Sequence, residues 1–375
     1  MSWRGRAEQA GAAIRAGGRW RSPRTLDGRG VTGTLDGTPV VSFASNDYLG
    51  LAAHPAPVAA AHAALDRWGA GAGSARLIVG SRPVHDELEA ELAAWKGTEA
   101  AVSFPTGFAA NLGVLGALGG LGGPGTLICS DVLNHASIID GCRLARSRGA
   151  EVAVYDHLDL DHLKRLLGEA GGRPALVVTD SVFSMDGDAV ELAGLGAVCA
   201  SAGALLVLDE AHAVLGPEAE LEGEVVRVGT LSKTLGALGG FVAGDRALVE
   251  LLVNTARSYI FTTAASPADA AAALAALRVL RSGEGDALVA RLRQLVGRVA
   301  GPGHHSPIIP VILGEEAAAL AAAERLLARG LLVPAIRPPT VPVGSARLRV
   351  TLSAAHTDEQ VGRLVAALDE VAAGR

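Results

Sequence analysis

Short apolar runs alternate with segments of helical periodicity from about residue 95 onward. Most of these runs are followed by helix-like stretches such as LDLDHLKRLLGEA, and this alternation predicts βα units and a mostly parallel sheet. We therefore expect a large α/β domain built on seven strands. The strand-like runs are AAVSF (100–104), TLICS (126–130), EVAVY (151–155), ALVVTD (175–180), ALLVLD (204–209), EVVRVGT (224–230) and GGFVAG (239–244).

The pattern changes at about residue 281, where longer helical segments enclose PIIPVIL and the alternating strand ARLRVTL. This arrangement is typical of a smaller α+β domain. The sequence thus predicts an N-terminal segment at 1–45, a large domain at 46–280 and a small C-terminal domain at 281–375.

Residues 100–130 carry no charge and are long enough to span a bilayer. Eight glycines and two prolines interrupt this stretch, so we expect a turn, a helix and a strand of an α/β domain instead.

Composition excludes several classes of protein. The formal charge of -6 over 375 residues disfavours a nucleic-acid partner, and the ten histidines lack metal-ligand spacing, so no metal is expected. Three cysteines give no framework of paired disulfides, and the N-terminus MSWRGRAEQAG lacks the apolar core of a signal peptide. We expect a protein of the reducing cytoplasm.

Only three of the 33 basic residues are lysines. Lys96 precedes Gly97 near the expected end of a helix, and Lys164 lies among other charges, so both are expected to be solvated. Lys233 is the single charge in GTLSKTLGALGGFVAG (229–244). If buried, its amine loses its proton more readily and can form a Schiff base; the alternative is a lysine whose ammonium reaches water past an apolar wall.

Pyridoxal phosphate needs a lysine for its aldehyde, an anion for its ring nitrogen and donors for its phosphate. Asp209 ends a strand-like run, PTGFAAN (105–111) offers a glycine turn before a helix N-terminus, and Thr230 and Ser232 add hydroxyls near Lys233. GTLSKT is not a nucleotide-hydrolase loop, since that loop requires Gly directly before the Lys.

Together these residues are part of a series of motifs that resembles the pyridoxal-phosphate-dependent α-oxoamine synthases, which have the aspartate-aminotransferase-like fold, fold type I. The resemblance runs along nearly the whole chain. Its motifs are SNDYLGL (45–51), ARLIVGSRPVHDELE (75–89), GFAAN (107–111), NHASIIDG (134–141), DSVFSMDGD (180–188), LDEAH (208–212), GTLSKTLG (229–236) and RPPTVPVGSARLRVTLSAAHT (337–357).

The resemblance implies roles for the residues that match these motifs. Lys233 would form the Schiff base, Asp209 would pair with the pyridinium nitrogen, and His212 would bond the phenolic oxygen of the cofactor. His135 would stack on the ring, and Ser184 would lie near the cofactor oxygen. From the residues alone, His135 could equally start a helix and Ser184 could belong to a simple turn.

Further matches concern the phosphate and the substrates. Gly107, Phe108 and Thr230 match phosphate contacts, and Thr262 and Thr263 match a segment that reaches the partner subunit's phosphate in family homodimers. Arg349 matches the arginine that binds the substrate carboxylate, although Arg347 lies on the same face of the strand. Asn46, Thr340 and Arg21 complete the implied substrate contacts, Arg21 at the thioester entrance.

The segments AIRPPTVP and ARLR most resemble the sequences of one branch of the family, which condenses L-alanine with a pimeloyl thioester in biotin synthesis. The acyl group would arrive on coenzyme A or on a carrier protein. Alternatives are a relative that joins glycine to acetyl-CoA, an ordinary aminotransferase, and a non-catalytic binding protein of the same fold. The sequence departs from the family after LDEAH, where AVLGPEAELEGE is short and poor in glycine, and in its N-terminal segment.

Overall fold

The computed structural model describes residues 1–373, and its largest sheet has seven strands in the order β4-β10-β9-β8-β7-β5-β6. Only β10 runs antiparallel to its neighbours; the other pairs in this sheet are parallel. The predicted strands and their mostly parallel arrangement are confirmed, each within one residue. The strands are β4 (Ala100–Phe104), β5 (Leu127–Asp131), β6 (Glu151–Tyr155), β7 (Ala175–Asp180), β8 (Leu205–Asp209), β9 (Val225–Thr230) and β10 (Gly240–Gly244).

Helices cover both faces of this sheet because successive side chains of a strand point to opposite sides. In β8, Val207 packs toward one face while Leu206 and Leu208 pack toward the other. The first face is covered by α4 (Gly107–Leu118), α5 (Ala136–Arg146), α8 (Arg246–Thr255) and α9 (Arg257–Ile260). The second is covered by α6 (Leu160–Glu169), α7 (Leu192–Ala202) and α3 (Pro83–Lys96).

The uncharged stretch 100–130 forms β4, α4 and most of β5, as predicted. Among the described residues, no helix is long and apolar enough to cross a membrane.

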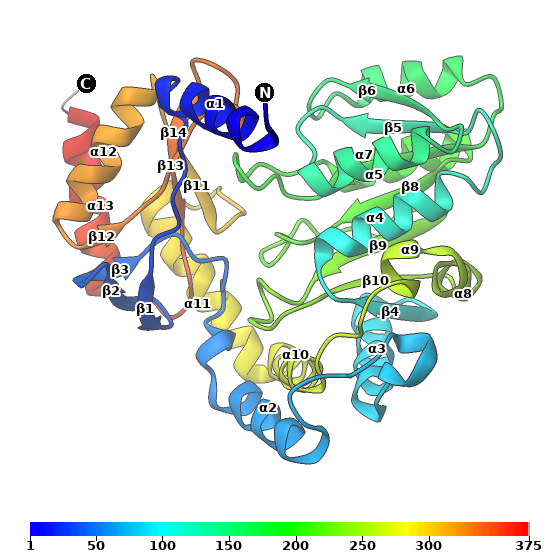
Figure 1. The fold of residues 1–375 in the computed structure, drawn as a ribbon, viewed down its shortest axis with the longest axis horizontal. Helices are drawn as coiled ribbons and strands as arrows, with labels where there is room; N and C mark the ends of the chain where they lie inside the picture. The colour runs from blue at the N-terminus through cyan, green and yellow to red at the C-terminus, as the bar shows by residue number, and fades with distance from the viewer. Residues whose placement is uncertain (374–375) are drawn as a thin grey trace.

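The smaller α+β part contains two sheets (Figure 1). An antiparallel sheet of β11 (Ile308–Gly314), β14 (Ala346–Thr351) and β13 (Ala335–Ile336) lies with α11 (Gly283–Ala300), α12 (Glu316–Ala328) and α13 (Asp358–Ala373). The second sheet holds β1 (Leu26–Arg29), β2 (Thr32–Leu35), β3 (Thr38–Ser42) and β12 (Leu331–Leu332). Because β3 pairs with β12, we propose that these first strands belong to the smaller domain; the boundaries at 46 and 281 stay a prediction.

Two helices join the parts at the bottom of Figure 1, α2 (Pro55–Trp68) and α10 (Pro267–Leu280). Leu51, in the short 3-10 helix Leu51–Ala53, belongs to the same buried cluster as Leu277 of α10 and Leu348 of β14. This continuous core fixes the smaller part opposite the loops of the large sheet. The N-terminal helix α1 (Trp3–Ala16) lies on the smaller part (Figure 1).

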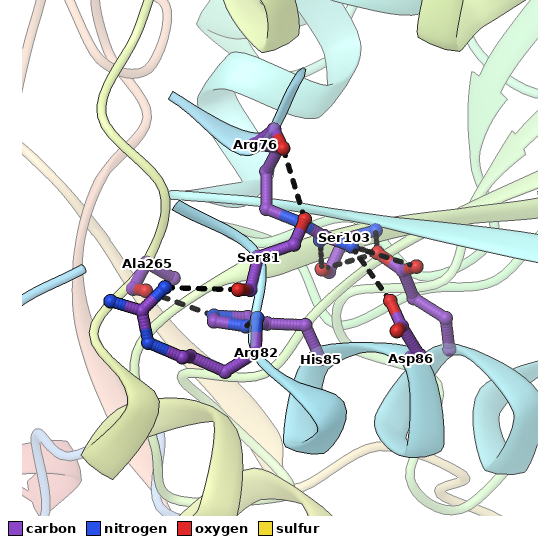
Figure 2. Close-up of polar contacts among 8 residues, drawn as sticks. Arg76, Ser81, Arg82, His85, Asp86, Ser103 and Ala265 are labelled. Atoms are coloured by element: carbon purple, nitrogen blue, oxygen red, sulfur yellow. Dashed lines mark hydrogen bonds and ion pairs between the residues drawn. The ribbon is translucent and has the colours of Figure 1, made fainter. Parts of the chain in front are cut away.

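A buried arginine holds the short helix Arg76–Gly80 against the large sheet. Arg76 binds both carboxylate oxygens of Glu89, at 2.7 and 3.1 Å, and donates to Ser103 of β4 at 2.9 Å. The same guanidinium donates to Ser81, just after this helix, at 2.8 Å. Figure 2 shows Arg76 and Ser81 beside each other. With Arg76 pointing inward, the apolar side chains at 77–79 face outward.

Candidate active site

The carboxyl ends of the parallel strands form one wall of a cavity of about 190 Å3. Asp180 ends β7, Asp209 ends β8 and Thr230 ends β9, so three strands deliver polar side chains to the same edge. Seven of the predicted site residues line this cavity: Gly107, Phe108, His135, Asp209, His212, Thr230 and Lys233. Ligands of open α/β sheets bind at this edge.

Lys233 lies in the turn between β9 and β10 and points into this cavity. Its Nζ atom is 2.7 Å from Nε2 of His212. Burial lowers the pKa of the Lys233 amine, Arg349 acts in the same direction, and attraction to Asp209 and Asp180 offsets part of the effect. Lys233 is half-buried, and its amine contacts the buried His212 within the cavity rather than reaching water past an apolar wall.

His212 links Lys233 to a tyrosine from a distant part of the chain. The hydroxyl of Tyr48 lies 2.5 Å from Nδ1 of His212, on the side of the ring opposite Lys233. Burial lowers the pKa of His212 well below its usual value, and repulsion from Lys233 and Arg349 adds to this effect. A neutral imidazole has one donor and one acceptor nitrogen, so it can connect the hydroxyl to the amine.

A side chain of α4, itself bonded to α5, holds the acidic end of β8. Asn111 donates from Nδ2 to Asp209 at 2.7 Å and to Ser137 at 2.9 Å. The backbone N–H of Ala211 donates to the other oxygen of Asp209 at 2.9 Å. Asp209 is thus a buried carboxylate with a fixed direction, facing the same cavity as Lys233.

Asp180 positions the segment that carries His135. Its carboxylate accepts the backbone N–H of His135 at 2.8 Å, and Nδ1 of His135 lies 2.7 Å from the hydroxyl of Ser137. Burial and the neighbouring charge of Asp209 raise the pKa of Asp180 well above its usual value. Burial also lowers the pKa of His135, although Asp209 opposes this shift, so a neutral ring faces the cavity.

The geometry distinguishes the two arginines of β14. Arg347 forms an ion pair with Asp186. The guanidinium of Arg349 instead donates to neutral oxygens, those of Ser184 (backbone, 2.5 Å), Thr351 (2.9 Å) and Asn46 (3.2 Å). Among residues 1–373, no carboxylate pairs with the buried Arg349, which does not line the 190 Å3 cavity, whereas Arg347 already has a carboxylate partner.

Comparison with known proteins identifies the family of this fold and site. The family model "Aminotransferase class I and II" matches residues 38–368. The chain belongs to this family.

Two relatives share about half of their residues with this family member. The chain is 48% identical to the 8-amino-7-oxononanoate synthase of Alkalilimnicola ehrlichii, with 96% of each chain covered. It is 50% identical to the 8-amino-7-oxononanoate synthase of Anaeromyxobacter dehalogenans strain 2CP-1, with 90% of this chain and 87% of the relative covered.

Solved structures of the family have the same fold. A serine palmitoyltransferase variant from S. paucimobilis with a bound PLP–myriocin aldimine matches with a TM-score of 0.88 and 29% identity over 98% of this chain and 97% of that chain. The 8-amino-7-oxononanoate synthase of Francisella tularensis matches with a TM-score of 0.72 and 26% identity over 89% of this chain and 97% of that chain.

The site of this family member fits a phosphate-bearing cofactor. The N-terminus of α4 presents the backbone of Gly107 and Phe108 to the cavity, beside hydroxyls of Thr230 and Ser232 that lie 2.7 Å apart. A Cβ atom at position 107 would lie 3.3 Å from Cβ of Thr230, so glycine keeps this cradle open. N–H groups and hydroxyls around a helix N-terminus are the donors that phosphate requires.

Several predicted residues lie outside the 190 Å3 cavity. The backbone carbonyl of Ser184 accepts a hydrogen bond from Arg349, so Ser184 holds that arginine in place. Arg21 and Thr340 line a separate cavity of about 280 Å3 with Arg19 and Arg337. Asn46 contacts Arg349 and Tyr48. Thr262 and Thr263 follow α9, away from the cavity of their own chain.

The residues that the sequence reasoning left without roles are Tyr48, Asn111, Ser137 and Asp180. All four lie within the motifs SNDYLGL, GFAAN, NHASIIDG and DSVFSMDGD, which carried the resemblance. These motifs could therefore have pointed to the four residues. Their contacts could not be foreseen, because they join residues as far as 164 positions apart.

The solvated role expected for Lys96 is wrong, whereas Lys164 is exposed as expected. The Nζ atom of Lys96 lies 2.7 Å from Glu210 and 3.8 Å from the centre of the Trp95 ring, and its side chain is only 15% exposed. Glu210 also pairs with Arg227. These charges border a cavity of about 660 Å3 that contains neither Lys233 nor Asp209.

Proposed function

We propose that this chain condenses L-alanine with a pimeloyl thioester to give 8-amino-7-oxononanoate, carbon dioxide and a free thiol, a step of biotin synthesis, with pyridoxal phosphate as cofactor. The observation that carries the proposal is the amine of the half-buried Lys233, in contact with a neutral imidazole and in the same cavity as Asp209. The identity to synthases of this name supports the choice of substrates.

Bound pyridoxal phosphate supplies an aldehyde that a neutral amine can bind reversibly and a pyridinium ring that stabilises negative charge on Cα of an amino acid. Asp209 would hold the pyridinium nitrogen, His135 the ring face and His212 the phenolic oxygen. The N–H groups of Gly107 and Phe108 would hold the phosphate, with the hydroxyl of Thr230.

Lys233 would act as the base that removes the Cα proton once it is free. Its lowered pKa provides the neutral form that accepts a proton, and the His212 contact fixes the direction of Nζ. Tyr48 holds the imidazole from its other side, so the amine returns to the same place after each transfer.

Arg349 would bind the carboxylate of L-alanine through two parallel N–H donors. Its hydrogen-bond acceptors are neutral oxygens, and burial lowers its pKa while Tyr48 opposes the shift. An incoming carboxylate would therefore supply a counter-charge that the described side chains do not. Asn46, which accepts from Arg349, would keep the guanidinium aligned.

We propose that Arg21 and Thr340 contact the acyl thioester. Both line the 280 Å3 cavity, which also contains Arg19 and Arg337. Three guanidinium groups would favour the anionic end of an acyl donor.

The working form is proposed to be a cytoplasmic homodimer. Three apolar side chains at 77–79 are 50 to 73% exposed and Phe261, next to Thr262, is 68% exposed, a pattern that a second copy would cover. Thr262 and Thr263 would then approach the partner's phosphate cradle. Free cysteines fit a reducing compartment. Sedimentation across a dilution series tests the dimer, and a monomer at micromolar concentration contradicts it.

The three lysines make a direct test possible. Borohydride reduction of the protein loaded with pyridoxal phosphate, followed by peptide mass spectrometry, should place the label on Lys233. Lys233→Ala should lose the visible absorbance and the label, whereas Lys164→Ala, at an exposed position, should keep both. A label on Lys164 or Lys96 contradicts the assigned site.

Substrate choice is tested by offering L-alanine or glycine with pimeloyl-CoA or acetyl-CoA and measuring thiol release. Turnover with L-alanine and pimeloyl-CoA alone is the expected result. Preference for glycine and acetyl-CoA would assign the chain to another α-oxoamine synthase, and formation of pyridoxamine phosphate would indicate an aminotransferase.

A further inference from the structure

His157 lies outside the proposed catalytic residues, yet its ring contacts two carboxylates from different loops. Nδ1 is 3.0 Å from Asp131, which ends β5, and Nε2 is 2.9 Å from Asp188. An ionised carboxylate only accepts hydrogen bonds, so both ring nitrogens can be satisfied together only when both carry a proton. The edge of the same ring packs against Phe183, with the ring centres 4.4 Å apart.

The first of these carboxylates anchors the turn that carries His135. Besides His157, Asp131 accepts the backbone N–H groups of Leu133 at 2.8 Å and Leu158 at 2.9 Å. Leu158 has a φ of 58°, which is uncommon for a residue with a side chain. Its N–H is held by Asp131. The turn after β5 is therefore tied to residues 157 and 158.

The second carboxylate belongs to the hairpin that holds Arg349. Phe183 donates its backbone N–H to the carbonyl of Asp188 at 2.9 Å, which closes the hairpin 183–188. The tip of this hairpin offers the carbonyl of Ser184 to Arg349. A Cβ atom at Gly187 would lie 2.2 Å from the carbonyl oxygen of Ile308, so the hairpin also fits closely against β11.

We propose that His157 is a positioning residue whose doubly protonated ring holds the His135 turn and the Ser184 hairpin in register, so that the ring-face histidine and the carboxylate-binding Arg349 stay correctly spaced. The inference rests on the proposed function of those two residues. It assigns His157 no contact with substrate or cofactor.

The charges around the ring support this inference. Burial alone would lower the pKa of His157, but the hydrogen bonds and the attraction of Asp131 and Asp188 outweigh it and raise the pKa to about 9. Asp156, next to His157, and His162, in the first turn of α6, contact each other at 3.2 Å. The imidazolium therefore persists across the neutral range and separates two carboxylates that would otherwise repel each other.

The first experiment needs no cofactor. Histidine labelled with nitrogen-15 in the cofactor-free protein reports the proton on each ring nitrogen by NMR. The signals of His157 are assigned as those that disappear in His157→Gln. Both ring nitrogens of His157 should remain protonated until about pH 9. A neutral ring at pH 7.5 would overturn the inference. This result is independent of the proposed reaction, so its failure is distinguishable from a protein that does not bind pyridoxal phosphate.

The second experiment measures L-alanine binding to the loaded protein from the visible spectrum. His157→Gln should weaken binding at least fivefold at pH 7.5, and the ratio to wild type should approach one above pH 9, where wild type also loses the charge. His157→Arg, which stays charged and has two donor sides, should bind within threefold of wild type and lose the pH dependence near 9.

The matched control is His162→Gln, a nearby histidine in the first turn of α6 whose ring contacts Asp156, and its alanine affinity should not change. A constant ratio for His157→Gln from pH 7 to 10, or equal losses in His157→Arg and His157→Gln, would overturn the inference. Should the wild-type protein respond to a different amino acid, that amino acid replaces L-alanine, since Arg349 would bind any α-carboxylate.

Discussion

Replacing Arg349 with lysine tests the proposed carboxylate site without removing its charge. The guanidinium now donates to Ser184, Thr351 and Asn46 and has donor capacity left for a substrate carboxylate. Lysine keeps the cation but presents a single nitrogen, so one hydrogen bond to a charged partner is lost. Such a bond contributes about 1.5–3 kcal/mol, which corresponds to a roughly 10- to 150-fold weaker affinity.

The assay is a titration of the loaded protein with L-alanine and, separately, with L-alaninamide, which lacks the negative charge. Arg349→Lys should weaken the binding of L-alanine by the stated factor and change that of the amide by less than threefold. Arg347→Lys is the matched variant on the same strand face, and since Arg347 pairs with Asp186, it should leave the affinity for L-alanine nearly unchanged. An unaltered affinity in Arg349→Lys, together with a large loss in Arg347→Lys, would refute the reasoning.

Three further outcomes follow from buried polar contacts. Arg76→Met leaves Glu89 without its counter-charge and should lower the free energy of unfolding, measured with urea, by about 3–5 kcal/mol. Replacing Glu89 by Met as well should recover much of this loss. Tyr48→Phe leaves Nδ1 of His212 without its partner, so we expect the free energy of unfolding to fall by about 1–3 kcal/mol and turnover to slow. Unchanged kinetics would count against the Tyr48 contact. His157 holds its proton to about pH 9 when folded but only to about 6.5 when unfolded, so its stabilising effect is complete below 6.5 and vanishes as pH rises through 9. The thermal unfolding temperatures of wild type and His157→Gln should converge above that pH. A constant difference between the two temperatures at all pH values would contradict the raised pKa of His157.

The resemblance to the α-oxoamine synthases could be established from the sequence because its motifs are local. Lys233, Asp209, His212, His135 and the Gly107 turn each belong to a short recognisable string, and all five line one cavity as expected. The assigned chemical roles of these residues stay proposals.

Contacts between distant segments escaped the sequence reasoning. Lys96 looked solvated beside Gly97 because the sequence around it contains no hint that Glu210, 114 positions later, lies 2.7 Å from its amine. The same reasoning could not separate Arg347 from Arg349, since both alternate onto one strand face and only Asp186, on another loop, distinguishes them.

The sequence by itself determined the order of strands and helices, since the period of apolar residues reports which local structure can bury them. It also determined which residues carry the cofactor-binding motifs. Only the tertiary structure decided the protonation states and the partners of charged groups, because the pKa of a side chain depends on burial and on charges brought close from elsewhere in the chain. Tyr48, His212 and Lys233 become a connected series only when three separate segments meet at the edge of the sheet.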